Sequence, residues 1–176
     1  MDNAHGEQVR LEPWGEDDFW LLRRTNTPEM TEHLGGPETE EKLVDRHRRY
    51  TELNVPGRVY RVVLAGPGRT VGSIAFWERE WQGGTVWETG WAVLPEFQGR
   101  GLAARAALAV AEEARAAGRN RYLHAFPGED HPASNAVCRK AGFELLGPVR
   151  FEYPKGTWMT SNDWRLDLEA VPLDTA

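Results

Sequence analysis

The sequence predicts an α/β fold of the α+β type. We expect a mixed, mostly antiparallel sheet of six to seven strands, flanked by about four helices. Three strand-like segments joined by short glycine turns follow one another over residues 58–94, which indicates an antiparallel meander. A strand–helix–strand unit follows over residues 85–126, and such a unit usually places its strands parallel. The length of 176 residues fits one domain, residues 1–176, rather than two.

The N-terminal part predicts one short strand and two helices. Residues 9–11 are short and extended. The acidic residues 16–18 open a helix, because acidic side chains suit the positive end of the helix dipole, and Pro28 interrupts it. A second helix is expected over residues 38–53, and Pro56 follows its end.

The remaining segments alternate between strands and helices. A helix is expected over residues 101–117, which are rich in alanine and leucine, and another over residues 132–141, which have a proline in the first turn. The expected strands are 58–65, 70–79, 85–94, 122–126, 143–153 and 159–168. The predicted order is therefore β-α-α-β-β-β-α-β-α-β-β.

Composition excludes several classes of protein. A net charge of -6 makes the chain a poor candidate for binding nucleic acid. The longest mostly apolar stretch, residues 102–111, is interrupted by Arg105 and is too short to span a bilayer. The first residues do not resemble a signal peptide, and the single cysteine, Cys138, excludes a disulfide framework and a cysteine-rich zinc site. We therefore expect a cytoplasmic protein with no metal.

The charge is unevenly distributed along the chain. Residues 1–41 carry three basic and eleven acidic side chains, whereas residues 42–176 carry 18 basic and 16 acidic ones. A solvated acidic surface is the simpler interpretation. The alternative is an acidic wall beside a site for a cationic substrate.

The stretch 87–103 carries the strongest chemical signal. A predicted strand ends in a loop with Gly99 and Gly101, and the loop opens a helix. Glycines let the backbone turn tightly, and a helix start adds four unpaired N–H donors. Such a loop suits a diphosphate, to which Arg100 could add a charged contact. An ordinary strand-to-helix turn is the plainer interpretation.

Two phosphate-binding patterns fit this loop poorly. The P-loop pattern Gly-x-x-x-x-Gly-Lys-Ser/Thr is absent. Gly99-x-Gly101-x-x-Ala104 formally matches the dinucleotide fingerprint. However, residues 95–97 separate the strand from the first glycine, and the preceding strands form a meander rather than a βαβ unit. A dinucleotide binder is therefore the weaker alternative.

A third pattern matches better. Gln98-x-x-Gly101-x-Ala103 resembles the Arg/Gln-x-x-Gly-x-Gly/Ala signature of the GNAT superfamily of N-acetyltransferases, which binds the pyrophosphate of acetyl-CoA. Residues 134–143 resemble the second conserved block of that family, most closely in its RimJ- and RimL-like branch. The resemblance covers roughly residues 9–168 in element order and implies the GNAT fold.

The resemblance implies direct acetyl transfer from acetyl-CoA to a primary amine in a ternary complex. The amine must lose a proton, the tetrahedral oxyanion needs a donor, and the leaving thiolate needs a proton. It implies an oxyanion donor in the backbone of Val93, with Leu94 beside it. The residues expected to bind the cofactor are Val93, Leu94, Gln98, Gly99, Arg100, Gly101, Leu102, Ala103, His131 and Ser134.

Glu88 is the candidate catalytic base. It lies near the position of a frequent strand-four glutamate of the family, ten residues before Gln98. Strand alternation places Glu88, Gly90 and Ala92 on one face. Partial burial would raise its pKa, so that it could act directly or through a water. A structural carboxylate that pairs with an arginine is an equal alternative.

The sequence departs from the family at the proton donor. Many members have a tyrosine five residues before the phenylalanine that corresponds to Phe143, and Cys138 stands there. A free cysteine is more often a buried apolar residue. Ser134, one helical turn earlier, is the second candidate catalytic residue and is expected to contact the sulfur end or the pantetheine of CoA. His131 stands where the family often has an asparagine that contacts pantetheine, with a helix-start role as the alternative.

The acceptor amine stays open, because fold and cofactor do not decide it. A small cationic amine is slightly favoured over a protein N-terminus, and residues 30–36 are expected on the acceptor side. Trp77 or Trp87 is a candidate wall of that pocket, although clustered tryptophans are more often core. The rival function is a non-catalytic acyl-CoA-binding sensor or scaffold. We expect no nucleic-acid or membrane partner, and leave a homodimer open.

Overall fold

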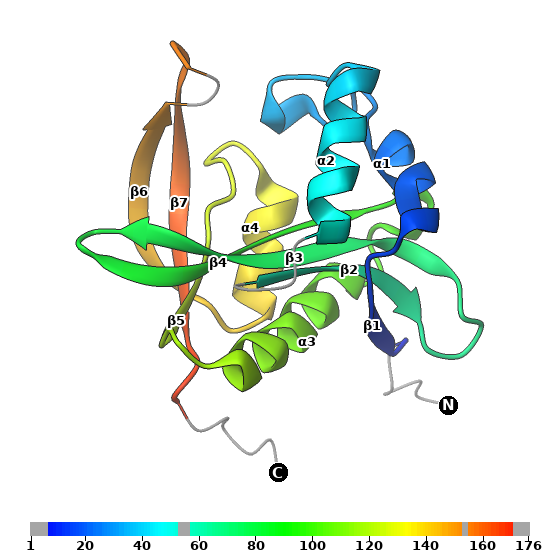
Figure 1. Cartoon of the computed structure of the whole chain (residues 1–176). Helices are drawn as coiled ribbons and strands as arrows, with labels where there is room; N and C mark the ends of the chain where they lie inside the picture. The colour runs from blue at the N-terminus through cyan, green and yellow to red at the C-terminus, as the bar shows by residue number, and fades with distance from the viewer. Residues whose placement is uncertain (1–6, 53–56, 153–154, 171–176) are drawn as a thin grey trace.

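The computed structural model describes residues 7–52, 57–152 and 155–170 (Figure 1). The strands are β1 (Val9–Pro13), β2 (Gly57–Leu64), β3 (Thr70–Trp81), β4 (Gly84–Val93), β5 (Tyr122–Ala125), β6 (Glu144–Glu152) and β7 (Trp158–Asp167). The helices are α1 (Phe19–Thr25), α2 (Glu40–Glu52), α3 (Leu102–Ala117) and α4 (Pro132–Lys140), with short 3-10 turns η1 (Glu16–Asp18), η2 (Glu32–Leu34) and η3 (Pro95–Phe97).

The strands form one seven-stranded sheet in the order β1-β2-β3-β4-β5-β7-β6. The first four strands are an antiparallel meander, and β4 pairs with β5 in parallel. This parallel pairing covers only Trp87 with Leu123 and Glu88 with His124. Beyond Glu88, as far as Val93, β4 pairs only with β3 among the described strands. The sheet therefore opens between β4 and β5.

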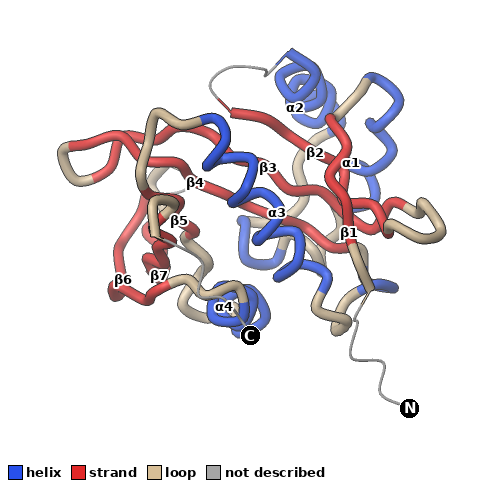
Figure 2. Tube along the Cα trace, turned by 90° about the horizontal axis from the view of Figure 1, so that it is seen from below, coloured by secondary structure: helices blue, strands red, loops and turns tan. Residues whose placement is uncertain are grey.

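The helices cover both faces of the sheet. Figure 1 shows α1 and α2 together on one side and α3 on the other, and Figure 2 shows α3 crossing the strands. α4 packs against α3 and β6. No helix in the described segments has the length and apolar character needed to cross a bilayer.

One part of the core lies between α3 and the sheet, and the rest includes Leu21, Leu22 and Leu43 from α1 and α2. Leu102, Ala106, Val110 and Ala114 are at most 1% exposed, and their spacing places them on one face of the helix. Alanines on this face let the helix approach the strands closely. At the far end, the fully buried Trp87 donates a hydrogen bond from Nε1 to the carbonyl oxygen of Gly118, 3.1 Å away. These contacts hold α3 against the sheet along its length.

The structure confirms the predicted fold class and element order and moves some boundaries. The predicted first helix divides into η1 and α1 at Asp18, whose carboxylate accepts a hydrogen bond from the N–H of Gly15 (2.7 Å) and pairs with Arg61 (3.2 Å). β3 continues to Trp81. The predicted ends at Leu53, Pro56 and Tyr153 lie outside the described residues, as do the first six residues.

Candidate active site

A cavity of about 1110 Å³ opens where β4 separates from β5. Its walls come from the middle of β3 and β4, the loop before α3, the start of α4 and the segment between α1 and α2. The predicted site residues that line it are Glu88, Val93, Gln98, Gly99, Gly101, Leu102, Ala103, His131 and Ser134. The fold thus brings the loop, the candidate base and the start of α4 to one cavity.

The loop before α3 has the conformation that its glycines predict. Gly99 and Gly101 have φ angles of 76° and 75°, in the left-handed region that favours glycine. A Cβ at either position meets no atom within 4 Å, so conformation rather than space requires glycine here. The amide of Arg105 bonds to the carbonyl of Gly101 (3.3 Å) and is the first of the helix. The N–H groups of the preceding helical residues are therefore free to bind an anion.

The same loop is tied to the open edge of β4. Gln98 donates a hydrogen bond from Nε2 to the carbonyl oxygen of Val93, 2.8 Å away. The N–H of Leu94 donates to the carbonyl of Val71 on β3 (2.8 Å). Because successive N–H groups of a strand point to opposite sides, the N–H of Val93 points toward the opening.

Two predicted cofactor-binding residues lie elsewhere. Leu94 is 1% exposed, and its N–H donates a hydrogen bond to Val71 on β3. Neither its side chain nor its amide therefore faces the cavity. Arg100 forms an ion pair with Glu7 and lies 5.5 Å from the centroid of the Phe97 ring. Its guanidinium is part of the outer surface of the loop and is 40% exposed.

Glu88 combines burial with a charged partner. Its side chain is 15% exposed, and its Oε1 accepts a hydrogen bond of 2.5 Å from Arg79. Burial raises the pKa of Glu88 above its ordinary value, while Arg79 and, to a smaller extent, His124 oppose the rise. The interpretation of Glu88 as a structural carboxylate predicted an arginine partner, and Arg79 is that partner. The carboxylate nevertheless lines the cavity.

Trp77 is the aromatic wall beside Glu88. It is opposite Glu88 across β3 and β4, and its ring lies over Gly90, where a Cβ would approach it to 3.2 Å. Of the two tryptophans predicted for the acceptor pocket, Trp77 lines the cavity, whereas Trp87 is fully buried against α3. The core interpretation therefore holds for Trp87, because the alternation of β4 turns it to the opposite face from Glu88.

His131 caps α4 and contacts Ser134. Its Nδ1 accepts the N–H of Ser134 (3.4 Å), and its Nε2 lies 3.2 Å from the Ser134 hydroxyl. The ring also stacks on His33 at 4.1 Å, and burial, followed by His33, lowers the pKa of His131. His131 therefore has the helix-start role and also lines the cavity, while its contact with pantetheine stays a prediction.

Cys138 is a core residue. It is fully buried, and burial raises the pKa of its thiol to about 12. A thiol with such a pKa, away from solvent, is inert. This supports the interpretation of Cys138 as a small apolar residue.

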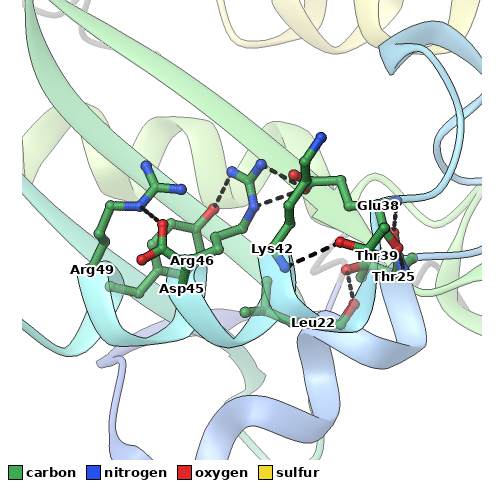
Figure 3. A network of polar contacts seen from close by, with 10 residues as sticks. Leu22, Thr25, Glu38, Thr39, Lys42, Asp45, Arg46 and Arg49 are labelled. Carbon is green, nitrogen blue, oxygen red and sulfur yellow. Dashed lines mark hydrogen bonds and ion pairs between the residues drawn. The ribbon is translucent and has the colours of Figure 1, made fainter.

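Polar contacts fix the wall formed by α2 (Figure 3). The side chain of Asn26 exchanges two hydrogen bonds of 2.8 Å with the backbone of Glu38, and the Glu38 carboxylate binds Arg46 on α2 at 2.6 Å. The Thr39 hydroxyl accepts the N–H of Lys42 (3.3 Å) in the first turn. Arg46 lines the cavity, and Glu38 balances its charge.

The acidic N-terminal residues divide into two groups. Several pair with arginines, as Glu12 does with Arg61 and Glu40 with Arg23, and these form structural or surface ion pairs. Three carboxylates, those of Glu29, Glu32 and Glu38, line the cavity, and Glu38 is also paired with Arg46. The acidic-surface and acidic-wall interpretations therefore each describe part of this segment.

Sequence reasoning missed Arg79 and Asn135. Asn135 is buried and bridges α4 to the sheet: its Nδ2 donates to the carbonyl of Gly128 (2.9 Å), and its Oδ1 accepts from Trp164 (2.9 Å). The feature of the sequence that could have identified Asn135 was a polar residue on the apolar face of a predicted helix. Nothing in the local sequence marks Arg79, because its partner is on another strand. In the described part of the chain, no cluster of His, Cys, Asp or Glu could hold a metal ion.

A mixed sheet that opens beside a glycine loop and a helix start is the arrangement of a protein that binds a phosphate-containing cofactor in the opening. A family model described as "Acetyltransferase (GNAT) domain" matches residues 8–144. The chain therefore belongs to the GNAT acetyltransferase family. A comparison with curated protein sequences finds no match.

Solved structures share the fold at low sequence identity. An acetyltransferase of the GNAT family from Bacillus anthracis superposes with a TM-score of 0.77 at 20% identity, covering 94% of this chain and 98% of that one. A Salmonella typhimurium enzyme that modifies the N-terminal serine of ribosomal protein L7/L12 gives 0.74 at 18%, covering 91% and 95%. An aminoglycoside acetyltransferase in complex with coenzyme A gives 0.72 at 20%, covering 91% and 95%.

Proposed function

We propose that this acetyltransferase transfers the acetyl group of acetyl-CoA to a primary amine by direct attack in a ternary complex, with residues 1–176 acting as one domain. The observation that carries the proposal is that the loop before α3, Glu88 and Ser134 all line the same cavity. Acetyl-CoA supplies the activated acetyl group, and the chain's own residues bind and orient both substrates.

The loop and the first turn of α3 would hold the pyrophosphate. The free N–H groups of Leu102 and Ala103 and the positive end of the helix dipole favour a dianion there. The left-handed Gly99 and Gly101 keep side chains out of the space that the phosphates need. His131 and Ser134, at the start of α4, would contact the pantetheine arm.

Three groups would act on the reacting atoms. Glu88 takes the proton that the amine loses as the new N–C bond forms, directly or through a water. The N–H of Val93 stabilises the negative charge on the carbonyl oxygen. As the C–S bond breaks, CoA leaves as the thiolate, which takes its proton from solvent, and the Ser134 hydroxyl donates a hydrogen bond to the sulfur. Cys138 takes no part, because its thiol is in the core.

The charge of the cavity favours a small cationic acceptor. Glu29 and Glu32 line its acceptor side, where the charges of Glu38 and Arg46 balance each other. A second cavity of about 470 Å³, which shares Glu32 with the first, adds Glu129 and Asp130. Such a wall attracts an amine that carries additional positive charge. The structural neighbours include an enzyme for a protein N-terminus and one for aminoglycosides, so a peptide amine is the competing acceptor.

Thiol release from acetyl-CoA across a panel of amines tests the proposal. The panel contains diamines and polyamines, aminoglycosides, amino acids and short peptides with free N-termini. We expect turnover with multiply charged small amines and little with neutral peptides. Turnover confined to peptides would overturn the preferred acceptor. CoA binding without thiol release from any amine would favour the acyl-CoA sensor and overturn the enzymatic proposal.

A further inference from the structure

Arg79 is held against Glu88 by aromatic rings. Its guanidinium lies over Trp81, Phe126 and Phe151, with ring centroids at 5.2, 4.9 and 4.5 Å. These rings come from β3, the segment after β5, and β6. Arginine binds aromatic faces through cation–π attraction and stacking. The three rings therefore fix the direction in which Arg79 approaches Glu88.

A second charged pair shares the same rings. The buried His124 and Asp163 are joined by a hydrogen bond of 2.6 Å between Nδ1 and Oδ1. The other oxygen of Asp163 accepts from Nε1 of Trp81 (3.2 Å), and Phe126 stacks on His124 at 5.6 Å. Trp81 thus contacts both charged pairs, so a shift of either one would disturb the other.

Arg79 and two of its three aromatic neighbours lie outside the lining of the cavity. Glu88 and Phe126 line the cavity, whereas Arg79, Trp81 and Phe151 are not among the described residues that do. Arg79 takes only Oε1 of the carboxylate, so Oε2 is left for an acceptor or a water. A carboxylate held in this way keeps a fixed orientation toward the cavity.

The electrostatics of Glu88 make such a partner necessary. Burial alone favours the protonated carboxyl, which cannot accept a proton from an amine. Among the described residues, the charged and titratable groups that face Glu88 are Arg79 from β3 and His124 from β5, with Asp163 of β7 behind His124. Arg79 bonds directly to Glu88 and lowers its pKa more than His124 does, so Arg79 is the principal cation that keeps Glu88 ionised.

We propose that Arg79 is a positioning residue for the reaction, which holds Glu88 ionised and aims one carboxylate oxygen at the acceptor amine. The proposal rests on the proposed function, in which Glu88 accepts the proton. Arg79 itself does not touch the reacting atoms. Its role is therefore separable from that of Glu88 by following the titration of the carboxylate directly.

The test follows the Glu88 carboxyl in protein labelled with ¹³C at the glutamate carboxyls, with Glu88→Gln to assign the signal. Arg79→Met removes the charge and keeps much of the side-chain volume. We expect its titration midpoint to rise by about one to three pH units, the usual effect of an adjacent arginine. The acidic limb of the pH profile of kcat/KM should move by the same amount. Arg79→Lys should move both by less.

Arg119→Met is the matched control. Arg119 forms an ion pair with Glu78 near the same end of β3, and its loss should leave the Glu88 midpoint and the rate profile in place. If Arg79→Met does not fold, Phe151→Leu removes one of the three rings and should raise the midpoint by a smaller amount. An unchanged midpoint in the folded variants overturns the proposal. A purely structural ion pair would move the midpoint as well, so the acidic limb of kcat/KM distinguishes the two roles.

The two proposals fail in different ways. If Arg79→Met moves the NMR midpoint while the acidic limb of kcat/KM stays in place, Glu88 is not the proton acceptor, and the catalytic part of both proposals is overturned. If Glu88→Gln retains full activity, the same conclusion follows independently of Arg79. CoA affinity should be unchanged in all of these variants, because the loop that binds the pyrophosphate is not altered.

Discussion

The side-chain amide of Gln98 donates a hydrogen bond of 2.8 Å to the carbonyl oxygen of Val93. This contact links the loop that would hold the pyrophosphate to the strand edge that would hold the oxyanion. Gln98 therefore has a structural role inside the protein, since it fixes the spacing between the loop and the open edge of β4.

Gln98→Ala should raise the Kd for CoA about fivefold, because the lost hydrogen bond is worth about 1 kcal/mol. The measurement is calorimetric titration with CoA. Gln8→Ala, at an exposed position, is the control and should bind CoA as the unaltered protein does. Equal affinities for the two variants would show that the link does not order the loop.

Gly101→Val should weaken CoA binding by about tenfold or more, that is, by at least about 1.4 kcal/mol. A branched side chain is strained at a φ of 75° and projects into the space beside the loop. Gly68→Val is the matched control, because Gly68 has a φ of 73° in the turn between β2 and β3. Both variants should lose stability, and only Gly101→Val should lose CoA affinity. A folded Gly101→Val protein with normal affinity would refute this placement of the cofactor.

Cys138→Ser should lower the free energy of unfolding by about 1–3 kcal/mol, because it buries a hydroxyl in place of a thiol. It should leave kcat unchanged. In the native protein a thiol reagent should modify Cys138 only as fast as the chain unfolds, since burial raises its pKa to about 12. Denaturant melts measure the loss of stability, and reagent kinetics measure the rate of thiol modification. A large fall in kcat with intact stability would instead identify the thiol as the acid.

Glu32→Gln should raise KM for a multiply charged amine about threefold at low salt and leave CoA affinity unchanged, as expected for an exposed charge worth up to about 1 kcal/mol. The difference should shrink at high salt because of screening. Glu16→Gln makes the same charge change on the exposed η1 turn, away from the residues that line the cavity, and is the control. Equal KM values for both variants would show that net charge, not the acidic wall, attracts the acceptor.

The sequence predicted the elements that depend on local chemistry. Acidic residues at a helix start, the alanine-rich 102–117 segment and the glycine turns between β2, β3 and β4 placed each element within a few residues of its observed bounds. The loop at Gly99 and Gly101 was predictable for the same reason, because a left-handed backbone favours glycine. The resemblance to the GNAT signature then indicated what the loop binds, and the family match confirms that membership.

Long-range contacts were not predictable in this way. The insertion of β7 between β5 and β6, the partners of Glu88 and the separation of Trp77 from Trp87 depend on which strands meet. The cytoplasmic location, the absence of a metal and the oligomeric state stay predictions.

The sequence by itself determined the fold class, the glycine loop before α3 and the family, because turn geometry, helix capping and a contiguous motif are properties of neighbouring residues. Only the tertiary structure decided that Arg79 faces Glu88, that Leu94 and Cys138 are turned into the core, and that three of the N-terminal carboxylates line the cavity. The physical reason is that burial and charge pairing arise between segments that are far apart in the chain. Those contacts act on the pKa of Glu88 and give the cavity wall its charge.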